Sequence, residues 1–169
     1  PAYGGGGILN LNGTVTINGS VISGNTALIG GGAGIWAGNE SSTYKFKTKI
    51  SNNSGGANES ISSGGAFVKR GNGPFNVNDS IITSNYAKTI GGAIYSNSTG
   101  EIVLKNTEIS NNSAENEGGG IFNYKGKISI DNSTLSGNKA TRIGAYGCGG
   151  AIFNNYENSE ILGDITITN

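Results

Sequence analysis

Few residues of this chain are suited to acid–base chemistry. The 169 residues include no histidine, which excludes a histidine-based triad and a zinc site of the Cys/His type. Three aspartates occur, Asp79, Asp131 and Asp164. Alignment of the repeats places Asp79 and Asp131 in neighbouring columns two coils apart, roughly 10 Å along the axis. Inverting glycosidases hold two carboxylates at a similar separation. The intervening coil offers Asn106 and Thr107 but no carboxylate and no arginine, so we expect turn residues and no enzyme.

Metal binding is a second kind of chemistry that the sequence offers. Glu115 and Glu117 flank Asn116, and these oxygen-bearing side chains could hold a weak calcium ion. The calcium-binding Gly-Gly-x-Gly-x-Asp repeat is missing, because no aspartate follows a glycine-rich phrase. We therefore expect no metal and no cofactor.

One recurring apolar position is a candidate for ligand binding. It directly follows the aliphatic residue that ends each glycine-rich phrase, and its members are Leu9, Trp36, Val68, Tyr95, Phe122 and Phe153. If the aliphatic residue points inward, strand alternation turns this position outward. The sequence thus predicts an outer stripe in which Trp36, Tyr95, Phe122 and Phe153 stack on sugar rings or dock a protein. The alternatives are that a loop covers the stripe or that the rings buttress the next coil.

Glycan attachment is also possible at nine Asn-x-Ser/Thr sequences. In a surface protein, some of these asparagines would carry glycans. The candidates are Asn39, Asn58, Asn97 and Asn111, of which the first two fall in a long insertion of the second repeat.

These side chains must be positioned by a repeated unit. A glycine-rich phrase ending in an apolar residue recurs at intervals of 27 to 32 residues, at Ile8, Ile35, Phe67, Ile94, Ile121 and Ile152. A fixed interval of this size is typical of a repeat architecture.

A second phrase follows each glycine-rich step. It consists of an aliphatic residue, a hydroxyl residue, any residue and asparagine, as in Ile82-Thr83-Ser84-Asn85. Short runs with apolar–polar alternation, such as Ile128-Ser129-Ile130, lie between the phrases and predict half-buried strands. The segment from Tyr44 to Lys49 reads as an insertion. Two sets of asparagines are expected to form amide ladders: Asn25, Asn53, Asn85, Asn112 and Asn138, and Asn18, Asn78, Asn106, Asn132 and Asn169.

Three short strands joined by turns make one coil, and no coil can bury its apolar side alone. Stacked coils bury a continuous core. The sequence therefore predicts an all-β, right-handed parallel β-helix of about five to six coils, each of roughly 27–32 residues. A β-sandwich is the rival fold, but a sandwich does not require one phrase at a fixed interval. We expect residues 1–169 to form a single β-helix domain or fragment, part of a longer chain or assembly.

The two phrases together resemble known repeats over the whole chain, from Gly5 to Asn169. Gly-Gly-Ala-Ile paired with an aliphatic-x-x-Asn phrase is similar to the repeats of chlamydial polymorphic outer-membrane proteins. It also resembles the adhesin-like surface proteins of methanogenic archaea and related bacterial β-helix proteins. The resemblance implies an extracellular, cell-surface segment that is used for adhesion or as a structural fibre.

The composition of the chain limits the classes of partner that it is expected to bind. The net charge is zero and the charged residues are scattered, so no nucleic acid is expected, and no apolar run has the length of a membrane-spanning helix. The expected partners are a host or neighbouring-cell surface glycan or protein, with head-to-tail self-association also expected. The alternative function is a β-helix carbohydrate-active enzyme, either a polysaccharide lyase or a glycoside hydrolase.

Overall fold

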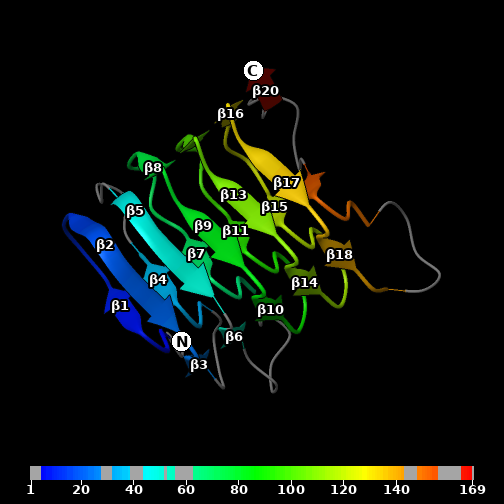
Figure 1. The fold of residues 1–169 in the computed structure, drawn as a ribbon, viewed down its shortest axis with the longest axis horizontal. Helices are drawn as coiled ribbons and strands as arrows, with labels where there is room; N and C mark the ends of the chain where they lie inside the picture. The colour runs from blue at the N-terminus through cyan, green and yellow to red at the C-terminus, as the bar shows by residue number, and fades with distance from the viewer. Residues whose placement is uncertain are drawn as a thin grey trace.

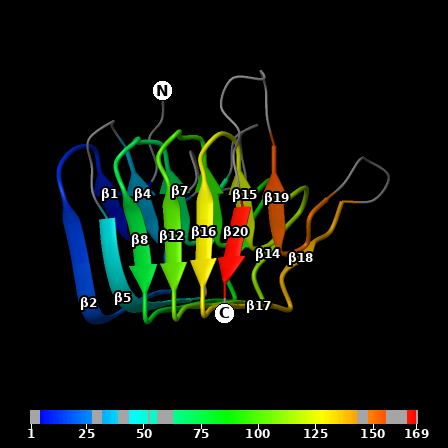
Figure 2. The same ribbon diagram turned by 90° about the horizontal axis from the view of Figure 1, so that it is seen from above.

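The chain folds as a stack of parallel coils, seen from the side in Figure 1 and from above in Figure 2. This computed structural model describes residues 5–27, 32–38, 44–51, 53–55, 63–142, 148–155 and 165–168. All of its elements are β-strands, and every strand pairing is parallel, which confirms the predicted β-helix.

The strands form three sheets that run along the stack. The first sheet has six strands: β1 (Ile8–Asn10), β4 (Ile35–Ala37), β7 (Phe67–Lys69), β11 (Ile94–Ser96), β15 (Ile121–Asn123) and β19 (Ile152–Asn154). The second has nine: β2 (Val15–Ser23), β5 (Tyr44–Ser51), β8 (Phe75–Asn78), β9 (Ile81–Thr83), β12 (Ile102–Lys105), β13 (Glu108–Ser110), β16 (Ile128–Asp131), β17 (Thr134–Ser136) and β20 (Ile165–Thr168). The third has five: β3 (Thr26–Ala27), β6 (Ser54–Gly55), β10 (Tyr86–Ala87), β14 (Ser113–Ala114) and β18 (Lys139–Ala140).

The core is built from columns of equivalent residues, as the repeat interval predicts. In the first sheet, Ile94 pairs in register with Phe67 on one side and Ile121 on the other. These three side chains and Ile35 are fully buried, while Ile8 and Ile152 at the end levels are only partly buried. Stacking in register therefore gives each coil the apolar partners that it lacks alone.

The corner of the second sheet depends on a left-handed backbone conformation. Gly19, Asp79, Asn106 and Asn132 all have φ between 43° and 58°. Glycine, asparagine and aspartate are the residues that tolerate this conformation best. At this corner the later coils break into two strands, for example β12 and β13.

The segment from Tyr44 to Lys49 is not an insertion, which corrects the sequence expectation. It belongs to β5, which pairs along its length with β2 and continues through the corner as one strand. This coil lacks the left-handed residue, because Phe46 and Lys49 pair with Val77 and Ile81 and are one residue closer together in the chain. Because this corner is one residue shorter, an alignment of the sequence alone does not match the segment to the equivalent strands of the other repeats.

Each glycine-rich phrase begins at another tight corner. Gly91 has a φ of 68°, and a Cβ added there would lie 2.5 Å from the carbonyl oxygen of Ile94. A side chain at Gly91 would therefore be strained by both the backbone and its surroundings.

The first predicted asparagine ladder is present. The Nδ2 atoms of Asn25, Asn53, Asn85 and Asn112 each donate to the Oδ1 atom of the next ladder asparagine, over 2.9–3.0 Å, and the last acceptor is Asn138. Backbone amides of the same four residues donate to these oxygens as well. The ladder thus joins five successive coils inside the solenoid.

The second ladder differs from the prediction by one position. Asn132 donates to Asn106 (2.8 Å), and Asn106 donates to Asp79 (3.0 Å) rather than to Asn78. Asn78 lies in the column of Lys105, and Asn18 of β2 pairs with Lys47 of β5, so neither belongs to this ladder. Asn169 lies outside the described residues.

Candidate functional site

The predicted stripe of aromatic residues forms a single column, but it is not exposed. Tyr95 pairs in register with Val68 and Phe122, and Phe122 pairs with Phe153. Trp36, Tyr95 and Phe122 are only 4%, 7% and 5% exposed. The expectation of an open aromatic surface is therefore wrong for these three, and the alternative that the rings buttress neighbouring coils describes the column better.

The column is the centre of a second hydrophobic cluster, separate from the main core. Tyr95 and Phe122 stack with ring centroids 5.8 Å apart, and Phe122 and Phe153 stack at 5.2 Å. Ile90 and Tyr124 pack against the cluster and are partly buried, as is Phe153. Burial raises the pKa of Tyr95. Direct stacking on a sugar would first require the cluster to open.

The candidate glycosylation sites differ in exposure. Asn111 is exposed and Asn97 is half-buried. Asn97 also forms a side-chain hydrogen bond with Tyr95. Asn39 and Asn58 lie outside the described residues. Of the two described candidates, Asn111 has the better access for a modifying enzyme.

Asp79 and Asp131 lie in neighbouring columns, as the repeat alignment predicts. Asp131 lies 3.6 Å from the Nζ atom of Lys105, and Asp79 accepts a hydrogen bond from Asn106. Asp79 lies at the turn and Asp131 ends β16, and both interact with a neighbouring coil, which favours a structural role. Asp164 lies outside the described residues.

The two glutamates proposed for calcium interact with different partners. Glu115 accepts a hydrogen bond from the Tyr86 hydroxyl, and Glu117 lies 4.0 Å from Arg142. Desolvation, followed by the nearby Glu115 carboxylate, raises the pKa of Tyr86 to about 12. Among the described residues, no three His, Cys, Asp or Glu side chains are grouped closely enough to hold a metal ion.

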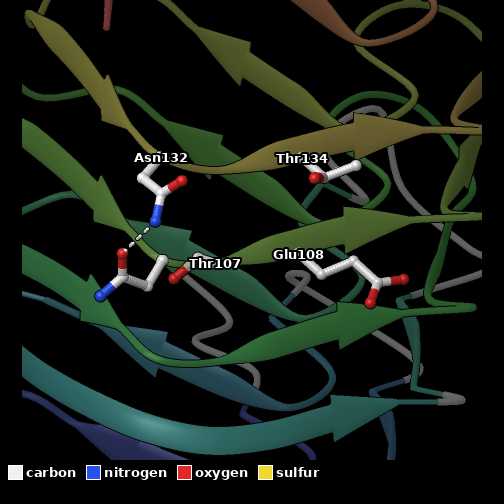
Figure 3. A pocket seen from close by; sticks show the side chains of 5 residues that line it. Thr107, Glu108, Asn132 and Thr134 are labelled. Carbon is white, nitrogen blue, oxygen red and sulfur yellow. Dashed lines mark hydrogen bonds between the residues drawn. The ribbon is translucent and has the colours of Figure 1, made fainter. Parts of the chain in front are cut away.

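A shallow polar hollow of about 320 Å³ lies at the corner of the second sheet. Figure 3 shows Glu108 and Thr134 on neighbouring strands and Asn132 at the turn that precedes one of them. Its lining residues are Asn106, Thr107, Glu108, Asn132 and Thr134. All except Thr107 are exposed. The volume is at the lower end of the range for small-molecule sites, roughly 300–1,000 Å³.

Hydrogen bonds hold the floor and one wall of the hollow in place. The Thr107 hydroxyl is buried and bonds to the carbonyl oxygens of Val77 (3.0 Å) and Lys105 (2.9 Å). On the other side, Ser110 donates to Glu108 Oε1 at 2.5 Å. The lining groups are therefore set on rigid elements, which favours a binding surface whose geometry exists before the ligand arrives.

Sequence reasoning missed Glu108 and Thr134 as members of a site. They occupy one outward column of the second sheet, which also contains Val21, Lys49 and Ile81. The residue types vary along this column, so no repeated chemistry marks it in the sequence. Only the corner brings this column beside the asparagine ladder.

Outside the hollow, Lys69 is unusual because it is a lysine whose side chain is fully buried. Its Nζ atom donates to the Gly71 carbonyl oxygen (2.7 Å) and to Ser98 Oγ (2.6 Å). Burial lowers the pKa of Lys69 to about 8. Strand alternation could have located it, because Lys69 lies two residues after the inward Phe67 in the same strand.

No helix among the described residues has the length and apolarity of a membrane-spanning segment. The chain was compared with protein-family models, with curated proteins and with solved structures, and none of these comparisons gave a match.

Proposed function

We propose that this chain is a rigid β-helical segment of an extracellular, cell-surface protein, used for adhesion or as a structural stalk. The observation that carries the proposal is the unbroken ladder from Asn25 to Asn138, which runs beside a continuous apolar core. Hydrogen bonds between the side-chain amides of these five coils resist bending and unstacking. Such a segment can hold a binding face at a fixed distance from a surface.

The adhesive face of this proposal is the polar outer side of the second sheet. The aromatic column is buried against Ile90 and Tyr124, whereas the hollow beside Glu108 is open. The partner class is a glycan or protein on a host or neighbouring cell.

A bead-binding assay tests the adhesive function. Fluorescent beads that carry residues 1–169 are expected to be retained on cell monolayers more strongly than bare beads. The matched control is the same chain with Asn85→Ala and Asn112→Ala, which breaks the ladder and is expected to lose the folded face. Equal retention of all three kinds of bead would remove the support for an adhesin.

A carbohydrate-active enzyme is the competing function, and it has its own test. Release of reducing ends from a polysaccharide would replace the adhesin proposal if Asp79→Asn and Asp131→Asn together abolished that release. Asp79 accepts a hydrogen bond from Asn106, and Asp131 forms an ion pair with Lys105. We therefore expect no such activity to depend on the two aspartates.

A further inference from the structure

We infer that the hollow at the corner of the second sheet is a binding site for a neutral oligosaccharide. The inference rests on the proposed adhesive function and names its contact site and ligand class. The groups that carry it are the amides of Asn106 and Asn132, the Glu108 carboxylate and the Thr134 hydroxyl.

The two amides are held at fixed positions. Asn132 donates to Asn106 and Asn106 donates to Asp79, so one N–H of each amide is used along the ladder. Both backbones are left-handed, with φ values of 43° and 49°. Gly19 occupies the same corner in an earlier coil at a φ of 58°. Glycine satisfies the backbone there, so the asparagine side chains are not required by the turn itself.

The hollow keeps hydrogen-bonding capacity that the protein does not use. Each amide has a second N–H, because an asparagine Nδ2 carries two donors. Among the described residues, Glu108 Oε2 and Thr134 Oγ1 form no hydrogen bond. The hollow thus presents donors and acceptors together, and a sugar hydroxyl, which both donates and accepts, is complementary to such a mixture.

An apolar side chain adjoins these polar groups. Ile81 is 42% exposed and pairs in register with Glu108 from the neighbouring coil. It offers the hydrophobic contact that the C–H face of a sugar ring needs. Ile81, Glu108 and Thr134 lie in register on three successive coils, which are about 4.8 Å apart, so the site is long enough to suit an oligosaccharide better than a single ring.

Charged ligands fit the hollow less well. A calcium ion takes six to eight oxygen ligands, and no group of three acidic side chains is present among the described residues. An anion would be repelled by Glu108, and the nearby Lys105 is already paired with Asp131. A neutral polyol therefore matches the site better than either ion.

The test is a titration of the isotope-labelled chain followed by NMR, with xylotetraose, cellotetraose and mannotetraose as probes. At least one probe is expected to shift the side-chain amide signals of Asn106 and Asn132 and the backbone signal of Thr134, with millimolar affinity. No shift with any of the three probes would overturn the inference. Shifts of the same signals with calcium chloride alone would assign the hollow to a cation instead.

The variants are chosen to keep the fold. Asn106→Gly combined with Asn132→Gly removes both amides and retains residues that accept the left-handed backbone. We expect this double variant, and separately Glu108→Gln, to weaken binding about tenfold or more. The matched controls are Asn76→Ala in β8 and Glu101→Gln directly before β12, both outside the hollow, and we expect both to bind like the parent chain.

The bead assay separates the two proposals. Retention of parent beads that the double glycine variant abolishes supports both the function and the site. If the folded double variant is retained as well as the parent, the adhesive function stands and the oligosaccharide site is wrong. If parent beads are not retained but the NMR shifts occur, the site stands and the adhesive function is wrong.

Discussion

The asparagine side chains of the inner ladder show how a polar residue becomes part of a core. Asn85 is 1% exposed, yet its Nδ2 donates to Asn112 Oδ1 and to the Ile50 carbonyl oxygen, while its Oδ1 accepts from Asn53. Burial of an amide is costly only when its hydrogen bonds are missing. The ladder supplies those bonds from the two adjacent coils.

Asn85→Ala is therefore expected to lower the free energy of unfolding by about 2–4 kcal/mol, because it removes the Oδ1 acceptor of the Asn53 backbone N–H and of the Asn53 amide, together with the Nδ2 donor to Asn112. Urea denaturation with an unchanged m value is the measurement. Asn76→Ala, on the outer face, should change stability by less than about 0.5 kcal/mol. Equal effects of the two changes would show that the ladder does not stabilise the fold.

The buried Lys69 side chain predicts how the free energy of unfolding changes with pH. Burial lowers its pKa from 10.5 to about 8 in the folded chain. Below pH 8 the ammonium group is charged in both states, and its burial opposes folding. Above about pH 10.5 the amine is neutral in both states, and this cost is gone. The free energy of unfolding should thus rise with pH between these values, by up to about 3 kcal/mol.

Comparison with Lys69→Met isolates this effect. The variant should lose the rise between pH 8 and 10.5 in chemical denaturation, whatever its absolute stability. Lys139→Met changes an exposed lysine and should keep the rise of the parent chain. A parent chain whose stability is flat or falls relative to Lys69→Met in this range would refute the assignment.

At the scale of the strand, the aromatic column shows the limit of reasoning from alternation. Period two correctly separates the inward Ile94 from Tyr95, since these residues belong to different hydrophobic clusters. It does not reveal that Ile90 and Tyr124 pack on the other side. The first sheet is therefore buried on both faces over much of its length.

Because Phe122 lies in this second hydrophobic cluster, its substitution is expected to lower the stability of the fold. Phe122→Ala should lower the free energy of unfolding by about 3–5 kcal/mol, because it removes a buried ring that stacks on Tyr95 and Phe153. Leu9→Ala tests the same column at a position that is 46% exposed, and thermal unfolding should detect only a small change. Loss of adhesion by Phe122→Ser with unchanged unfolding would instead restore the aromatic stripe as a binding surface.

For the whole molecule, the direction of the ladder gives the stack two different ends. Each bond between two ladder asparagines runs from Nδ2 in the earlier coil to Oδ1 in the later coil, from Asn25 to Asn138. At the last described level, the core-column residues Ile165 and Ile167 are 40% and 68% exposed. We propose that coils stacked in this one direction associate head to tail, which is the heterologous type of contact that forms filaments.

The 169-residue chain is accordingly expected to form elongated oligomers that grow with concentration in sedimentation velocity. Ile167→Lys should suppress them, because it places a charge on the apolar end of the core. Dispersed monomers at high concentration would contradict self-association. Unchanged oligomers of Ile167→Lys would place the contact elsewhere.

The parallel β-helix, the core columns at Ile35, Phe67 and Ile94, and the inner ladder through Asn85 can all be predicted from the amino-acid sequence. These features follow from the spacing and alternation of residues within each repeat. Both are local properties of the sequence, and they recur in every coil of the stack. The burial of Tyr95, the surroundings of Lys69 and the proximity of Asn132 to Glu108 depend instead on the three-dimensional packing of the coils. Alternation fixes the side of a strand on which a residue lies, but what packs on that side depends on corners and neighbouring coils.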